Sequence, residues 1–210
     1  MNSRYFPPES SKHDICAFLD VSRETQEKLE IYVSLLQKWQ QRINLVSSST
    51  LPQVWQRHIL DCGQLVPYLP AETSTVMDIG AGAGLPGLVL AILTNHRLHL
   101  VESDAKKVAF MRTALAETGV EAVIHHGRIE DLACLQVDVV TARALAPLTR
   151  LFQLTQTQHH ACLDYLFLKG KGAKQELTEV PSWLTLSADI YPSVTEKEAV
   201  ILHFKSQNHI

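Results

Sequence analysis

The chain has little of several features that would narrow its function at once. Its 210 residues include four cysteines, all far apart and without a Cys-x-x-Cys pair, so neither a disulfide framework nor a cysteine metal site is indicated. No apolar run approaches the roughly 20 residues of a membrane span. The first residues also lack a basic segment followed by an apolar core, which an export signal would have. We therefore expect a cytoplasmic protein with reduced thiols and no membrane partner.

An excess of positive charge is also absent. Lysine and arginine number 19 against 22 acids, a formal charge of -3, which excludes a uniformly basic nucleic-acid binder. Any RNA contact must then come from a local patch. The pairs His125-His126 and His159-His160 do not indicate a metal, because neighbouring residues of a strand point to opposite faces. No Ser-His-Asp order or nucleophile elbow supports hydrolase chemistry.

The sequence divides into a helical first third and a longer part that alternates strands and helices. A composition of 46% hydrophobic and 20% charged residues fits one globular domain with a small extension. We expect a helical extension over residues 1–70 and a cofactor-binding domain over 71–210. Apolar residues three and four apart from Leu29 to Ile43 indicate one helical face, and Leu51 to Val66 reads as a second, short helix.

Seven strands separated mostly by helices predict an α/β fold, a largely parallel sheet covered on both faces. The last two strands lack a long connecting helix, which predicts an antiparallel edge. The expected strands are Thr75 to Asp78, Arg97 to Glu102, Glu121 to His126, Val137 to Ala142, Tyr165 to Lys169, Thr185 to Tyr191 and Ala199 to Lys205. The expected helices begin at Pro86, run from Ala105 to Glu117 before Gly119, from Pro147 to about His159, and from Gly172 to Glu179.

A glycine loop follows the first strand and is the strongest functional signal. Gly80, Gly82 and Gly84 permit positive φ and close ligand approach. Gly82-x-Gly84-x-x-Gly87 satisfies the dinucleotide fingerprint, and a ribose-binding acid is expected near Glu102. Asp78, however, would repel a pyrophosphate and suit the ammonium and sulfonium of S-adenosylmethionine. S-adenosylmethionine is favoured, while an NAD cofactor and a tight turn without any ligand stay open.

Polar residues that follow the later strands are further candidates for ligand contacts. Ligands of open α/β sheets bind beyond the carboxyl ends of the strands. Glu102 can accept hydrogen bonds from both ribose hydroxyls, or else supply charge at a helix N-terminus. Ile129 and Glu130 can flank the adenine. Arg143, a lone cation among small residues, suits a substrate phosphate or base edge, with a surface ion pair as the alternative.

With these residues in view, the chain resembles the bacterial glucose-inhibited division protein B family, the 16S ribosomal RNA guanine-N7 methyltransferases of type G. The resemblance covers most of the chain. It is carried by Asn44-Leu45, Arg57-His58-Ile59-Leu60-Asp61, Asp78 to Gly87 with its Gly-Leu-Pro-Gly ending, Lys106-Lys107-Val108 with Phe110, Arg143-Ala144 and Leu168-Lys169-Gly170. Cys62 departs from the family's serine.

The resemblance implies a Rossmann-like class I methyltransferase that modifies one guanine, conventionally numbered 527, in 16S rRNA of the small ribosomal subunit or its precursor. It implies S-adenosylmethionine contacts at Gly80, Leu85, Ile129, Glu130 and Arg143. The full set of expected cofactor residues is Asp78, Gly80, Gly82, Gly84, Leu85, Glu102, Ile129, Glu130 and Arg143. The expected RNA patch is Arg57, His58, Lys106, Lys107, Lys169 and Lys171, with Arg112 as a further candidate. For Lys107 and Arg112 the alternative is ordinary solvated surface.

Guanine N7 carries a free lone pair and no proton, so attack on a sulfonium methyl needs no general base. We expect Arg143 and Lys169 to position the reactants, and a monomeric enzyme without metal. An NAD-dependent oxidoreductase, a small-molecule methyltransferase and a non-catalytic ribosome-assembly factor are the alternatives.

Overall fold

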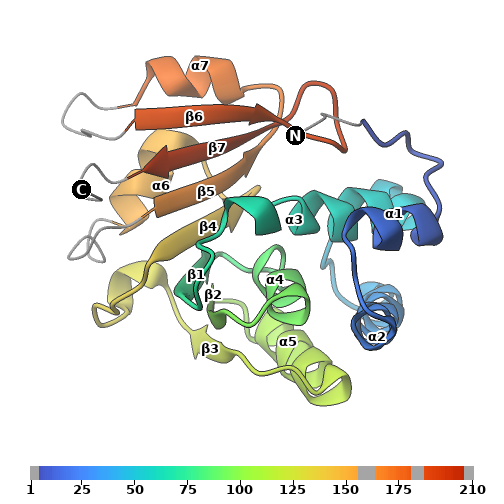
Figure 1. Cartoon of the computed structure of the whole chain (residues 1–210). Coiled ribbons are helices and arrows are strands. Elements are labelled where there is room, and N and C mark those ends of the chain that lie inside the picture. The colour runs from blue at the N-terminus through green and yellow to red at the C-terminus, as the bar shows by residue number, and fades with distance from the viewer. Residues whose placement is uncertain (1–4, 156–163, 181–186, 206–210) are drawn as a thin grey trace.

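The computed structural model describes residues 5–155, 164–180 and 187–205 of the chain. Its centre is a seven-stranded sheet in the order β3-β2-β1-β4-β5-β7-β6 (Figure 1). The strands are β1 Thr75–Ile79, β2 Arg97–Glu102, β3 Val123–His126, β4 Val139–Arg143, β5 Asp164–Lys169, β6 Ser187–Pro192 and β7 Val200–Lys205. β1 to β5 are parallel, whereas β7 runs antiparallel to both β5 and β6. The predicted sheet is confirmed, with its antiparallel strand one position in from the edge.

Helices cover both faces of the sheet, as the alternation of strands and helices predicted. The helical segments are α1 Lys12–Phe18, α2 Arg23–Gln40, η1 Ser48–Gln53, η2 Trp55–Leu60, α3 Asp61–Gly63, η3 Val66–Tyr68, α4 Gly87–Leu93, α5 Ala105–Thr118, η4 Ile129–Asp131, α6 Leu148–Thr155 and α7 Ala173–Thr178. One core joins α2, α4 and α5 to one face, and a second core joins α6 to the other. Among the described helices, none is both long and apolar enough to cross a bilayer.

The N-terminal helices pack into the main core. The Ser11 side chain and Asp14 form a capping box at the start of α1, and Ser22 caps α2. Leu29, Tyr32 and Leu36 are fully buried in the same cluster as α4 and α5. The boundary near residue 70 stays a prediction.

The single helix expected over Leu51 to Val66 is wrong in form. Pro52 has no N–H to donate and lies in the 3-10 turn η1. The following segment, η2, is a π-helical turn in which the Asp61 amide bonds the carbonyl of Gln56. Such turns often occur at functional sites. The side chains of this segment, Arg57 among them, therefore point in other directions than they would on a regular α-helix.

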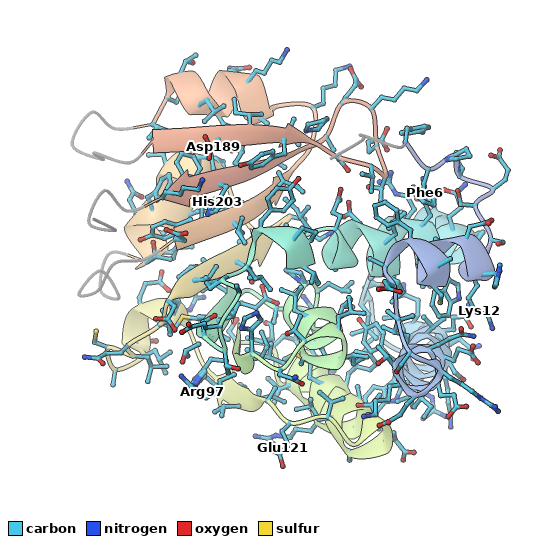
Figure 2. All side chains as sticks on the ribbon, in the orientation of Figure 1. Phe6, Lys12, Arg97, Glu121, Asp189 and His203 are labelled. Atoms are coloured by element: carbon cyan, nitrogen blue, oxygen red, sulfur yellow. The ribbon has the colours of Figure 1, made fainter. Side chains whose placement is uncertain are left out.

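Polar side chains also pair between neighbouring strands of the sheet. Asp189 and His203 face each other across β6 and β7 (Figure 2), and His203 Nε2 lies 3.0 Å from Asp164 Oδ2. His125 stacks on His99, with 2.9 Å between their ring nitrogens. In the described ranges, no three metal-ligating side chains gather. The predictions for His159-His160, Cys162 and Thr185 lie outside these ranges.

Candidate active site

The loop between β1 and α4 is closed by its own backbone and by two carboxylates. Gly80, Gly82 and Gly84 all have positive φ. Gly82 N–H donates to Glu102 Oε2 over 2.8 Å, and Gly87 N–H donates to Asp78 Oδ2 over 2.8 Å. Tyr32 on α2 donates its hydroxyl to the Ala83 carbonyl, also over 2.8 Å, and is buried. Helix α2 thus holds the loop directly.

Asp78 lies beneath the loop and has no exposed surface. Besides Gly87 N–H, it accepts a 3.3 Å hydrogen bond from the Thr141 hydroxyl on β4. Burial raises the pKa of Asp78 to about 7, against the lowering effect of its hydrogen bonds. The carboxylate expected to face a ligand is therefore committed to protein groups and organises the loop from behind.

A first cavity of about 400 Å³ opens at the carboxyl ends of β1, β2 and β4. Of the expected cofactor residues, Gly80, Glu102, Ile129, Glu130 and Arg143 line it. Asp78, on β1, and Gly82, Gly84 and Leu85, in the loop, do not line the cavity. The predicted set thus divides into residues that line the cavity and residues that do not.

Glu102 links the cavity to the loop. Its Oε1 accepts from Asp104 N–H over 2.8 Å, while Oε2 accepts from Gly82 N–H. A carboxylate has about four acceptor positions, so capacity for ligand hydroxyls is left. Glu130, at the opposite wall, pairs with Arg150 over 2.8 Å across an exposed surface.

Arg143, at the end of β4, is held by the irregular segment after Pro52. Its Nε lies 2.9 Å from Asp61 Oδ2, and one terminal nitrogen donates to the Arg57 carbonyl over 2.8 Å. The other lies 3.1 Å from His58 Nδ1, which must accept the proton. His58 is buried, and burial, followed by the nearby Arg143 and Arg57, lowers its pKa to about 3. It is therefore neutral here.

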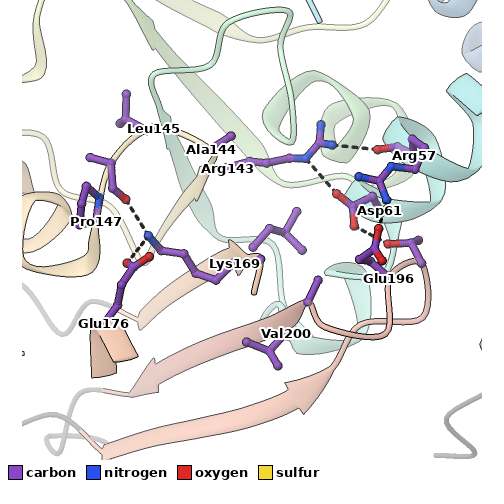
Figure 3. Close-up of a pocket in the computed structure, with 15 residues that line it drawn as sticks. Arg57, Asp61, Arg143, Ala144, Leu145, Pro147, Lys169, Glu176, Glu196 and Val200 are labelled. Atoms are coloured by element: carbon purple, nitrogen blue, oxygen red, sulfur yellow. Dashed lines mark hydrogen bonds and ion pairs between the residues drawn. The ribbon is translucent and has the colours of Figure 1, made fainter. Parts of the chain in front are cut away.

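A second cavity of about 470 Å³ adjoins the first (Figure 3). Both cavities share Arg143, Ala144, Leu145 and Ala146, the segment that ends β4 and follows it. Lys169 from β5 points into the second cavity, donating to the Ala146 carbonyl over 2.6 Å and pairing with Glu176 over 2.7 Å. Arg57 pairs with Glu196 across the cavity's rim.

The structure places the expected RNA residues in different surroundings. Arg57 and Lys169 line the second cavity, and Lys107 lines the first. Lys106 is exposed, and the side chain of Lys171 is 82% exposed, 3.6 Å from Glu198. His58 is buried and bonded to Thr50, so it offers no exposed cation.

Several residues of the site escaped sequence reasoning. Arg128 and Arg150 line the first cavity, Glu176 and Glu196 the second, and Leu145 both. Arg128 directly precedes Ile129 and could have been included on that ground. No local sequence pattern indicated that Glu176 and Glu196 belong to the site, because their partners, Lys169 and Arg57, lie on other elements.

Comparison with known sequences points to one family. A family model described as rRNA small subunit methyltransferase G matches residues 25–205. Similar relatives bear the name ribosomal RNA small subunit methyltransferase G, and two of them serve as examples. The chain is 45% identical to that of Paramagnetospirillum magneticum, over 88% of this chain and 90% of the relative. It is 45% identical to that of Rhodospirillum rubrum, over 93% and 95%.

Solved structures resemble the fold at low identity. A ribosomal protein L11 methylase from Lactobacillus delbrueckii subsp. bulgaricus has a TM-score of 0.61 and 12% identity, covering 72% of this chain and 79% of that one. A SAM dependent methyltransferase from Aquifex aeolicus has a TM-score of 0.57 and 9% identity, covering 73% and 92%. With its Rossmann-like class I methyltransferase fold, the chain belongs to the rRNA small subunit methyltransferase G family.

Proposed function

We propose that this protein methylates N7 of a single guanine, conventionally numbered 527, in 16S rRNA of the small ribosomal subunit, with S-adenosylmethionine as the methyl donor. One observation carries the proposal. Two cavities adjoin at the carboxyl ends of the central strands and share the segment after β4, so that a cofactor and a base can meet there. Family membership supplies the class of substrate.

The first cavity fits S-adenosylmethionine, which when bound supplies an electrophilic methyl group on a sulfonium. Glu102 would hold the ribose hydroxyls with its remaining acceptor positions, and Ile129 would pack on the adenine. A Cβ at Gly82 would meet only the Gly80 carbonyl, at 3.8 Å, so the backbone there is open to close approach. Gly80 and Glu130 complete the proposed contacts.

The loop is unsuited to the pyrophosphate of NAD. A dinucleotide needs free amides at the helix N-terminus. Here the amides of Ala81, Gly82, Gly84, Leu85 and Gly87 all donate within the protein. Pro86 contributes no amide. The fingerprint glycines Gly84 and Gly87 serve packing instead, because a Cβ on either would collide with Leu88 or with Asp78.

The second cavity suits a base that has left its stack. Guanine N7 has no proton to remove, so the protein's task is positioning, which can supply roughly 7–11 kcal/mol. Arg143 and Lys169 are both fixed by partners on neighbouring elements and line this cavity. Arg57, Lys106, Lys107 and Lys171 are the proposed phosphate contacts. We propose a cytoplasmic monomer that meets the small subunit or its precursor.

The test is to incubate the protein with labelled S-adenosylmethionine and small subunits that lack the modification, in parallel with free 16S rRNA. We expect label in RNA at one guanine, as N7-methylguanine. Label on another base or another atom contradicts the proposal. Transfer of the label to a small molecule other than the methyl donor, and not to RNA, supports the small-molecule alternative. Tighter binding of NADH than of S-adenosylmethionine in a separate titration supports the oxidoreductase.

A further inference from the structure

Leu145 is an exposed apolar side chain on the segment that the two cavities share. It is 39% exposed and lines both cavities. Of the large apolar side chains exposed in the described ranges, it alone lines either cavity. Burial in the core therefore does not account for its position.

Two features of the backbone hold Leu145 there. Ala144 has φ of 51°, a left-handed conformation that residues with a side chain rarely adopt and that tends to persist at functional sites. Gly80, on the opposite side, leaves room for the leucine, because a Cβ there would lie 2.5 Å from Leu145 Cδ1. The left-handed conformation of Ala144 and the absence of a side chain at Gly80 thus both favour this position of the Leu145 side chain.

Apolar and charged residues together line the second cavity, and several of the charged side chains are already paired. Asp61 holds Arg143, Glu176 holds Lys169, and Glu196 holds Arg57. Figure 3 shows these pairs joined across the cavity while Leu145, on the loop after β4, takes no part in them. A nucleobase needs polar partners at its edges and an apolar partner on its face. Leu145 is an exposed apolar side chain that lines both this cavity and the cofactor cavity.

We propose that Leu145 is a positioning residue that packs on the face of the target base and fixes its plane relative to the methyl group. This inference rests on the proposed function. It predicts that shortening the Leu145 side chain lowers the rate of methylation more than it lowers the affinity for S-adenosylmethionine.

The experiment compares Leu145→Ala, Leu145→Met and the wild-type protein, with Ile190→Ala as control. Ile190 is 51% exposed on β6 and lines neither cavity. Methylation of small subunits gives kcat and KM, and equilibrium dialysis gives the Kd for S-adenosylmethionine. Misplacement of a reactant by about 1 Å can cost about 100-fold in rate, which is the loss expected in kcat/KM for Leu145→Ala. Leu145→Met should recover most of it, and the cofactor Kd should change little.

An unchanged kcat/KM for Leu145→Ala in the presence of an active wild-type protein overturns this inference alone. A loss of cofactor affinity as large as the loss of rate also overturns it, since Leu145 would then be a wall of the cofactor cavity. A wild-type protein that does not methylate small subunits rejects the proposed function, and this inference with it.

Discussion

At the scale of single residues, Glu102 combines loop closure with the proposed ribose contact. Hydrogen bonds to a charged acceptor contribute roughly 1.5–3 kcal/mol each. We expect Glu102→Gln to weaken S-adenosylmethionine binding by about 10-fold or more, because charge is lost at Gly82 N–H and at the ribose together. Calorimetric titration measures the change. Glu121→Gln, at an exposed position beyond α5, is the control, and equal affinities for the two variants would contradict the assignment.

Asp78 should give stability an unusual pH dependence. Its pKa is raised to about 7 in the folded state from an unfolded value near 3.8, so the folded protein holds a proton that the unfolded chain releases. The stabilisation of the folded state by this proton is complete below the unfolded pKa of Asp78. It is lost as the pH rises through the folded pKa of about 7. Urea unfolding of the wild type and of Asp78→Asn, between pH 4 and 7.5, should show wild-type stability falling relative to the variant. Parallel pH profiles would show that the raised pKa is absent.

At the scale of elements, α2 supports the glycine loop through one buried hydrogen bond. Tyr32→Phe leaves the Ala83 carbonyl without that donor, which costs about 1–3 kcal/mol for a buried group. Urea unfolding should show this loss, together with weaker S-adenosylmethionine binding. Tyr68→Phe, for a tyrosine that lines neither cavity, should leave cofactor binding at the wild-type level. If Tyr32→Phe is as stable as the wild type, the hydrogen bond from α2 does not support the glycine loop.

The packing of α4 against β1 makes a second prediction at this scale. A Cβ on Gly87 would lie 2.7 Å from Asp78 Cβ and also collide with Leu100. Gly87→Ala should therefore destabilise by about 1–3 kcal/mol through overpacking. Gly172→Ala, where the nearest atom is 3.7 Å away, should stay close to wild type. Thermal unfolding of both variants checks this, and equal midpoints would contradict the packing argument.

The elements and the site differed in how far the sequence alone could predict them. Strands such as Arg97–Glu102 were predicted to the residue, because buried parallel strands bounded by polar residues have a strong local signature. The irregular segment after Pro52 was missed, since a π-helical turn has no periodic pattern. Asp78 was read as a ligand contact, and only the fold reveals that Gly87 and Thr141 occupy its oxygens. Pairs such as Lys169 with Glu176 depend on tertiary contacts that no local pattern contains.

At the scale of the whole molecule, the acidic chain must attract RNA through one face. The carboxyl ends of β1 to β5 hold both cavities and the exposed Lys171. Lys205 lies at the opposite edge, because β7 begins beside Lys169 and ends beyond Tyr165. We expect Lys171→Ala to weaken RNA binding and to reduce the slope of log K against log salt by about 1. Lys205→Ala should change neither. Filter binding from low to physiological salt measures both, and equal effects of the two variants would contradict a localised RNA face.

The position of β7 between β5 and β6 also constrains how the protein is made. During synthesis β6 leaves the ribosome before β7, yet β6 can join the sheet only through β7. The turn between these two strands supplies Thr195, whose hydroxyl donates to Asp61 over 2.7 Å, and Glu196, which pairs with Arg57. A nascent chain that ends before Val200 thus has its cofactor loop and the residues Thr195 and Glu196, but lacks the strand that anchors their turn beside the second cavity. The enzyme cannot assemble its complete site until that last strand has emerged.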